Sequence, residues 1–269
     1  FFLVRLAIYL AIWSILALWF RRASIRQDHS AEPRLTGRME ALSPLGLIFF
    51  GITVTLAAFD LVMSLAPAWY STIFGVYLFA GAVVAGLSAM ILVLLGLDRS
   101  GLLRSTLTTE HYHDLGKLLF AFVFFWGYIA FSQYMLLWYA SLPETTGWLL
   151  RRGAESLAGV DNPWTNISIA LAVGHMLVPF AGLLSRHVKR AAGLLVGWSV
   201  WLLFMHYLDV FWLIMPELDG GVHFGVPEVA AMIGIGGLFV AVVVRNLAAA
   251  SLRPVRDPRA VESLAFQNI

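Results

Sequence analysis

The chain contains no cysteine among its 269 residues. Iron–sulfur clusters held by thiolates, thiolate zinc sites, covalent c-type haem and disulfide frameworks all require cysteine side chains. The sequence therefore predicts that none of these groups is attached to this chain.

Charged residues are also scarce. They make up 13% of the chain, whereas soluble domains carry about 25%. The formal net charge is only +2, which gives nucleic-acid binding no support. Hydrophobic residues reach 60% and the mean hydropathy is +0.81, so a soluble protein of this composition would have no surface able to face water. These figures predict an all-α, polytopic membrane protein.

Seven apolar runs are long enough to cross the hydrocarbon core, which takes about 20 residues in a helix. Lipid requires every backbone group to be satisfied within the segment, so we expect each run to be a helix rather than a strand. Prolines fit this division, because Pro44 and Pro227 fall at first-turn positions. Pro67, Pro143 and Pro216 mark the ends of the second, fourth and sixth runs. The predicted helices cover residues 1–20, 44–66, 71–97, 118–142, 164–185, 191–215 and 227–244.

Lysine and arginine are distributed unevenly between these runs. The first, third and fifth connections and the C-terminal tail carry 15 of the 18, whereas the alternate connections carry only Arg151 and Arg152. Positive residues gather on the cytoplasmic side of a membrane. We therefore expect a transmembrane domain over residues 1–249, beginning outside, and a cytoplasmic tail over residues 250–269.

The connection over residues 143–163 is longer than a turn and places Trp148 close to Arg151 and Arg152. Two interpretations stay open for it. It could be a short amphipathic helix in the headgroup layer with Trp148 as an interfacial anchor, or an ordinary ordered loop.

Four ionisable residues fall inside the predicted spans: Asp60, His175, His206 and Asp209. A charge at the membrane centre costs about 3 kcal/mol on insertion scales, so such residues are candidates for function. All four lie in the outer half or at the midplane, and we interpret them as a ladder that descends from the outside. His206 and Asp209 are three residues apart, so they share one helix face.

Helical spacing also predicts inward-facing polar stripes. On the fourth run, Tyr128 and Ser132 fall on one face. Pro179 lacks the N–H that would bond the carbonyl of His175, which frees an acceptor near mid-membrane. Structural roles compete with functional ones at these positions, because a single buried His is usually a packed, hydrogen-bonded residue and Asp60 could make a structural interhelical bond.

Three chemistries suit these groups. A proton path uses His, whose ordinary pKa near 6.5 allows exchange near neutrality, and carboxylates. Quinol binding uses a His or Asp that accepts the hydroxyl proton. A b-type haem would need His175 and His206 to face one cavity.

His113, Asp114 and Lys117 stand at the predicted cytoplasmic mouth of the fourth helix. A metal site is conceivable, but this spacing alone is a weak signal. Helix capping by Asp114 and a solvated charge pair with Lys117 are the favoured interpretations, and we expect no metal.

Three stretches of sequence carry a family resemblance: HYHDLGKLLFAF at 111–122, FWGYIAFSQYMLLWYA at 125–140 and PETT at 143–146. Together they closely resemble the second NrfD-like membrane subunit (ActF) of bacterial alternative complex III, a quinol:electron-acceptor oxidoreductase. The resemblance implies a fold of about ten spanning helices. The seven found here would be its C-terminal part, which agrees with a chain that opens inside an apolar run without Met.

The same resemblance implies a place in the bacterial inner membrane and a set of partners. These would be a sister NrfD-like subunit, an iron–sulfur subunit, and multihaem and monohaem cytochrome c subunits, with lipids around them. Haem c and the clusters would sit on those partners, so we expect this chain to have no redox centre and no catalysis alone. In the family the subunit is described both as binding quinone, such as menaquinone, and as conducting protons, and we favour the proton path. A secondary transporter, which also uses intramembrane Asp and His, is the alternative from another class. Inverted repeats would favour it, and the sequence shows none.

Overall fold

The computed structural model describes residues 1–103, 106–153, 162–218 and 221–267, and within these ranges the chain is helical without any strand. Seven helices in the described ranges are long and apolar enough to cross a membrane. They are α1 (Phe2–Ser30), α2 (Pro33–Leu61) with the 3-10 turn η1 (Met63–Leu65), α3 (Phe74–Arg99), α4 (Thr109–Ala140), the continuous span α6 (Trp164–Leu171), η3 (Ala172–Leu177) and α7 (Val178–Leu184), α9 (Ala192–Leu218), and α10 (Val226–Ala248). The prediction of an all-α multi-pass membrane protein is thus confirmed.

Several helices extend well beyond their apolar runs. α1 continues to Ser30, α2 begins at Pro33 and α4 begins at Thr109. The apolar run measures only the part inside hydrocarbon, whereas a helix continues wherever its backbone bonds stay favourable. Two proline assignments were therefore wrong: Pro44 lies inside α2 rather than in its first turn, and Pro216 lies inside the last turns of α9.

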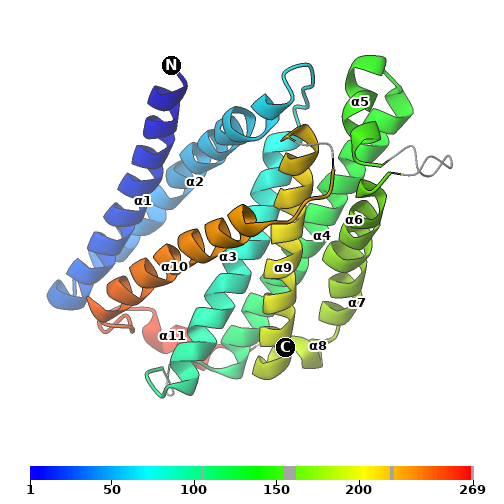
Figure 1. The fold of residues 1–269 in the computed structure, drawn as a ribbon. Coiled ribbons are helices and arrows are strands. Elements are labelled where there is room, and N and C mark those ends of the chain that lie inside the picture. Colours follow the sequence, from blue (N-terminus) through cyan, green and yellow to red (C-terminus); the bar gives the residue numbers. More distant parts are fainter. Residues whose placement is uncertain (104–105, 154–161, 219–220, 268–269) are drawn as a thin grey trace.

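The core of the bundle forms around α3, which packs against α2, α4 and α9 (Figure 1). Val84 and Ile91 of α3 and Leu202 of α9 are fully buried there. Gly81 of α3 allows α9 to come close, because a Cβ at this position would lie 2.9 Å from the His206 ring. Close approach through small residues is the usual way in which membrane helices pack.

Two short helices mark opposite ends of the bundle (Figure 1). α5 (Pro143–Arg151) lies at one end, here called the α5 side, and α8 (Arg186–Arg190) lies at the other, here called the α8 side. The helical interpretation of the segment after residue 143 is confirmed as far as Arg151, and residues 154–161 of that segment lie outside the described ranges.

The tail after residue 249 folds back on the α8 side. It includes α11 (Ala260–Ala265), which the sequence analysis did not predict. Arg259 forms an ion pair with Glu40 of α2 at 2.7 Å, and the Ser263 hydroxyl lies 3.0 Å from His111 Nε2. These contacts tie the tail to the ends of α2 and α4.

Candidate functional site

The buried carboxylate of Asp209 is the centre of the site. Asp209 is 1% exposed, in the middle of α9. His206 stands one turn earlier on the same face, with its Nδ1 atom 4.0 Å from Asp209 Oδ2. That distance allows an electrostatic contact but exceeds the length of a direct hydrogen bond.

Two neighbouring helices complete the surroundings of this carboxylate. The Tyr77 hydroxyl of α3 donates a hydrogen bond to Asp209 Oδ1. Trp126 Nε1 of α4 donates to Oδ2 at 3.2 Å. A buried carboxylate that accepts hydrogen bonds from two other helices holds α3, α4 and α9 in one arrangement. The sequence alone indicates neither donor, since an isolated Tyr or Trp in an apolar run resembles ordinary packing.

His175 packs on the Trp126 indole. Its ring is fully buried, with a centroid 3.9 Å from that of Trp126 and 6.3 Å from that of His206. Neither ring nitrogen of His175 has a hydrogen-bond partner among the residues that the structure describes. The structure therefore brings His175, His206 and Asp209 into one polar cluster in the apolar bundle.

The backbone around His175 is a π-helical turn, η3. In such a turn each N–H bonds the carbonyl five residues earlier, as Val178 does with Val173. Pro179, which has no N–H, leaves the carbonyl of Gly174 free in this register. That carbonyl accepts from Trp201 Nε1 at 2.7 Å. The carbonyl that Pro179 leaves for a side chain is thus that of Gly174, whereas the prediction named that of His175.

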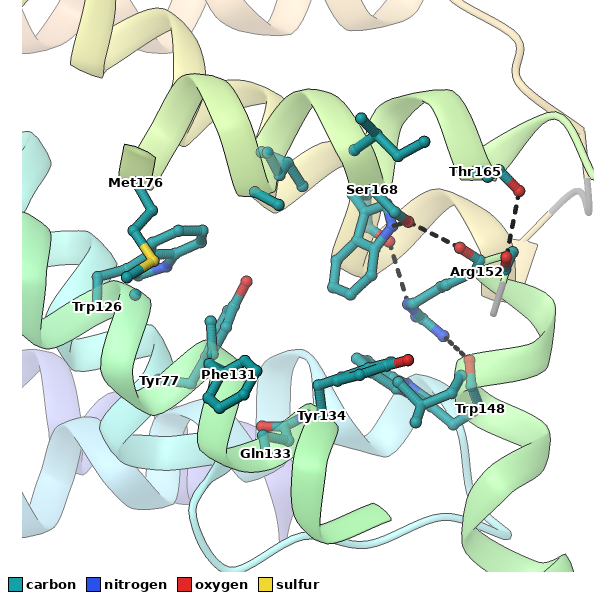
Figure 2. A pocket seen from close by; sticks show the side chains of 18 residues that line it. Tyr77, Trp126, Phe131, Gln133, Tyr134, Trp148, Arg152, Thr165, Ser168 and Met176 are labelled. Carbon is teal, nitrogen blue, oxygen red and sulfur yellow. Dashed lines mark hydrogen bonds between the residues drawn. The ribbon is translucent and has the colours of Figure 1, made fainter. Parts of the chain in front are cut away.

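A cavity of about 420 Å³ adjoins the cluster, and aromatic rings form much of its wall (Figure 2). Tyr77 and Trp126, the two donors to Asp209, lie at one end of it. Arg152 and Trp148 lie at the other end. Volumes of 300–1,000 Å³ are typical of ligand sites with apolar walls and few polar groups. The cavity is therefore large enough for a small aromatic molecule, and its wall includes the two side chains that donate to Asp209.

Arg152 closes the cavity on the α5 side. It is 1% exposed and forms an ion pair with Glu217 at 2.9 Å. Its guanidinium group lies 3.7 Å from the Trp148 ring centroid. Burial lowers the pKa of Arg152 to about 10, while the Glu217 carboxylate acts in the opposite direction, so Arg152 is still charged at neutral pH.

The remaining bonds of Arg152 explain why Pro216 sits inside α9. Because Pro216 has no N–H, the carbonyl of Trp212 is left without its helical partner. Arg152 Nε donates to this carbonyl at 3.3 Å, and Nη2 donates to that of Leu213 at 2.7 Å. From the sequence alone, Arg152 is only a charge of an interfacial segment. The signal that could have identified it is the pairing of an isolated arginine with a proline near the end of the sixth run.

Asp60 is not part of this cluster. Its carboxylate pairs with Arg5 at 2.7 Å and accepts from the Tyr9 hydroxyl at 2.8 Å, and both partners lie on α1. The predicted ladder therefore divides in two: Asp60 joins α1 to α2, whereas the other three ionisable residues lie together around Trp126.

The inward face of α4 also differs from the prediction. Tyr128 is 57% exposed, and neither Tyr128 nor Ser132 lines the cavity. The buried residues of α4 instead include Leu119, Trp126 and Gln133, which are spaced by two turns. The prediction that Tyr128 faces inward is therefore wrong, because on this helix an indole and an amide side chain turn inward and the tyrosine ring does not.

At the α8 side, Lys117 and Asp114 form the predicted charge pair at 2.7 Å. The predicted capping by Asp114 is wrong, because Thr108 and His111 form a capping box at the start of α4, one and a half turns earlier. His113 is buried, with its Nδ1 atom 3.8 Å from Glu110. Within the described part of the chain, no group of three His, Asp or Glu side chains could hold a metal ion.

Comparisons with known proteins add no family to this description. No protein-family model matches the chain, and a search of curated proteins finds no match.

Proposed function

We propose that the chain is a membrane subunit of a quinol-oxidising electron-transfer complex, and that it carries a proton away from mid-membrane. The observation that carries this proposal is the hydrogen bond from Tyr77, in the cavity wall, to the buried carboxylate of Asp209. His206 lies next to that carboxylate and His175 lies next to His206, so the polar groups form a continuous line from the cavity wall.

Each member of this line suits proton transfer. A tyrosine hydroxyl can accept a proton from the cavity while it donates its own to a carboxylate. Asp209 can pass a proton toward His206, 4.0 Å away, after a small rotation or through one water. Ionisable groups at this depth line proton routes in many membrane proteins.

The resemblance of residues 111–146 supports the assignment to an alternative complex III. Oxidation of one quinol releases two electrons and two protons. The electrons would pass to haem c and iron–sulfur centres on partner subunits, and this chain would take up a proton. The arginine distribution supports a cytoplasmic α8 side in a bacterial inner membrane. Single cysteines at Ser263 and Thr146, labelled with an impermeant maleimide in intact cells, test this orientation: labelling of Thr146→Cys alone is expected.

The cavity supports a second candidate function, the binding of the quinol ring itself. Its aromatic wall and its volume of about 420 Å³ suit a planar ring. Tyr77 would then accept the hydroxyl proton directly. This function and the proton path share Tyr77 and Asp209. They differ in whether the quinol ring itself occupies the cavity.

Two conservative substitutions test the proton path in the assembled complex, reconstituted in vesicles. Tyr77→Phe and Asp209→Asn keep shape but remove a transferable proton, and we expect quinol oxidation or coupled proton release to fall about 100-fold. Subunit content on a gel checks that the complex stays assembled.

Two matched variants serve as controls. Tyr128→Phe removes the hydroxyl of an exposed tyrosine on α4. Asp60→Asn removes the charge of a carboxylate that pairs with α1. Both should retain turnover and proton release. Wild-type proton release in Tyr77→Phe and Asp209→Asn would show that the cluster is structural.

A further inference from the structure

α10 is the least buried spanning helix. None of its 23 residues, all of which are described, is buried, and it slants in front of α3, while the segment that leads into it passes in front of α9 (Figure 1). In α3, α4 and α9 a third of the apolar window is buried. An exposed apolar helix could simply face lipid, so this observation alone identifies no partner.

The segment that leads into α10 is different, because it is not helical. Val222–Gly225 has no regular structure, and all four residues are exposed. The Phe224 ring centroid lies 6.0 Å from that of Phe211 and 6.3 Å from that of Tyr207, both on α9. These two residues precede the end of α9 by about two and three turns, or about 10–16 Å along its axis. The irregular segment therefore reaches down to membrane depth.

Its backbone is unsatisfied there. The N–H and C=O groups of Val222, His223 and Phe224 have no hydrogen-bond partner in the described part of the chain. Gly225 N–H bonds only Glu228 Oε2, at 2.8 Å. Non-helical backbone at membrane depth occurs only where protein covers it or where it lines a water-filled cavity.

The surroundings favour protein over water. Three of the exposed side chains next to this backbone are apolar, namely Val222, Phe224 and Val226, and His223 is an exposed polar side chain among them. No residue of the segment lines the cavity at Arg152. On α10 itself, Ala230 and Gly234 are one turn apart, which allows a second helix to approach closely. An apolar surface with a narrow polar strip is the pattern of a helix–helix contact in a membrane.

We infer that Val222–Glu228 and the adjoining surface of α10, here called the α10 face, bind a membrane-spanning helix of another polypeptide. That helix carries hydrogen-bonding side chains opposite Val222–Phe224. It also carries a basic side chain opposite Glu228, because a carboxylate at this depth needs a compensating charge. This interface is independent of whether the Asp209 cluster moves protons.

Spin labels test what covers the α10 face, and the absence of native cysteine makes single-site labelling direct. Phe224→Cys and Val226→Cys are labelled in native membranes, with Leu177→Cys, an exposed position on η3, as the comparison. Polypeptide cover predicts low collision rates with both oxygen and a water-soluble nickel chelate at positions 224 and 226. High oxygen accessibility at these positions would mean lipid, and high nickel accessibility would mean water. Either result overturns the inference.

A photo-crosslinking residue in place of Phe224 identifies the occupant. The expected product joins this chain to a different polypeptide. Products confined to one chain or to two copies of it would overturn the assignment. Glu228→Gln should weaken co-purification of that polypeptide, since the amide oxygen can still cap Gly225 N–H but the charge is gone. Glu262→Gln, an exposed position on α11, should not. Equal recovery with both variants would contradict the predicted basic partner.

Discussion

The Tyr77 hydroxyl and the Asp209 carboxylate, on α3 and α9, form a buried hydrogen bond between residues 132 positions apart in the chain. Tyr77 also lines the aromatic cavity, so this single contact connects the cavity to the polar centre of the bundle. Trp126 donates to the same carboxylate and packs on His175, so it is a second link between the cavity wall and the buried ionisable residues.

We first predict that Trp126 and Asp209 are energetically coupled. Trp126→Phe removes the N–H donor but keeps an aromatic ring beside His175. Asp209→Asn removes the carboxylate that accepts this hydrogen bond. In a double-mutant cycle, unfolding in detergent should give a coupling energy of about 0.5–3 kcal/mol. Trp198→Phe, measured with Asp209→Asn, is the comparison, because Trp198 makes no hydrogen bond to this carboxylate in the described residues. Additive effects of Trp126→Phe and Asp209→Asn would show that the 3.2 Å contact contributes little.

The membrane class and the number of spans could be predicted because both depend on local composition. An apolar run of about 20 residues has few alternatives in lipid. The ends of α1, α2 and α4 could not be predicted, because polar helix outside hydrocarbon leaves no hydropathy signal. The interior position of Pro216 could not be predicted either. It depends on Arg152, which is distant in sequence and donates to the Trp212 carbonyl that Pro216 leaves without a helical partner.

For the site, the sequence identified ionisable residues but not their neighbours. His206 and Asp209 could be paired because they share one helix. Asp60 was placed with them by depth alone, and depth does not say which helices are adjacent. Tyr77, Trp126 and Arg152 depend on tertiary packing, so no periodicity in the chain indicates them. Tyr128 shows the converse error, since a polar group on an apolar helix need not face inward.

A second prediction concerns the cavity. Ala130 lines it, and Ala130→Phe should fill part of the space, so that a photoreactive quinone analogue no longer labels the chain in the assembled complex. Ala121→Phe, at an exposed position of the same helix, is the matched control and should leave labelling unchanged. Equal labelling of both variants would rule out this cavity as the quinone site, and would leave the proton path as a separate question.

A third prediction concerns Arg152, whose partner Glu217 is nearly buried. Glu217 pairs with two arginines, the buried Arg152 at 2.9 Å and the half-exposed Arg151 at 3.1 Å. Arg152→Met keeps the length of the side chain but removes the buried cation, and breaking a buried ion pair typically costs about 3–5 kcal/mol. Unfolding in detergent should show this loss, and Arg152→Met combined with Glu217→Gln should recover part of it. Arg151→Met removes the neighbouring, half-exposed arginine and should cost less than about 1 kcal/mol. Equal losses for Arg151→Met and Arg152→Met would contradict the assigned role.

The last prediction uses two glycines of α3 that differ in their surroundings. A Cβ at Gly81 would lie 2.9 Å from the His206 ring, whereas a Cβ at Gly86 would meet nothing within 4 Å. Gly86→Ala should therefore be neutral or stabilise the protein by up to about 1 kcal/mol, because alanine favours the helix. Gly81→Ala gains the same propensity but must displace His206 or separate α3 from α9, so we expect a net loss of about 1–3 kcal/mol. If His206 moves away from Asp209, proton release in the complex should fall with Gly81→Ala and not with Gly86→Ala. Identical behaviour of the two variants would show that the close contact between α3 and His206 does not exist in the membrane.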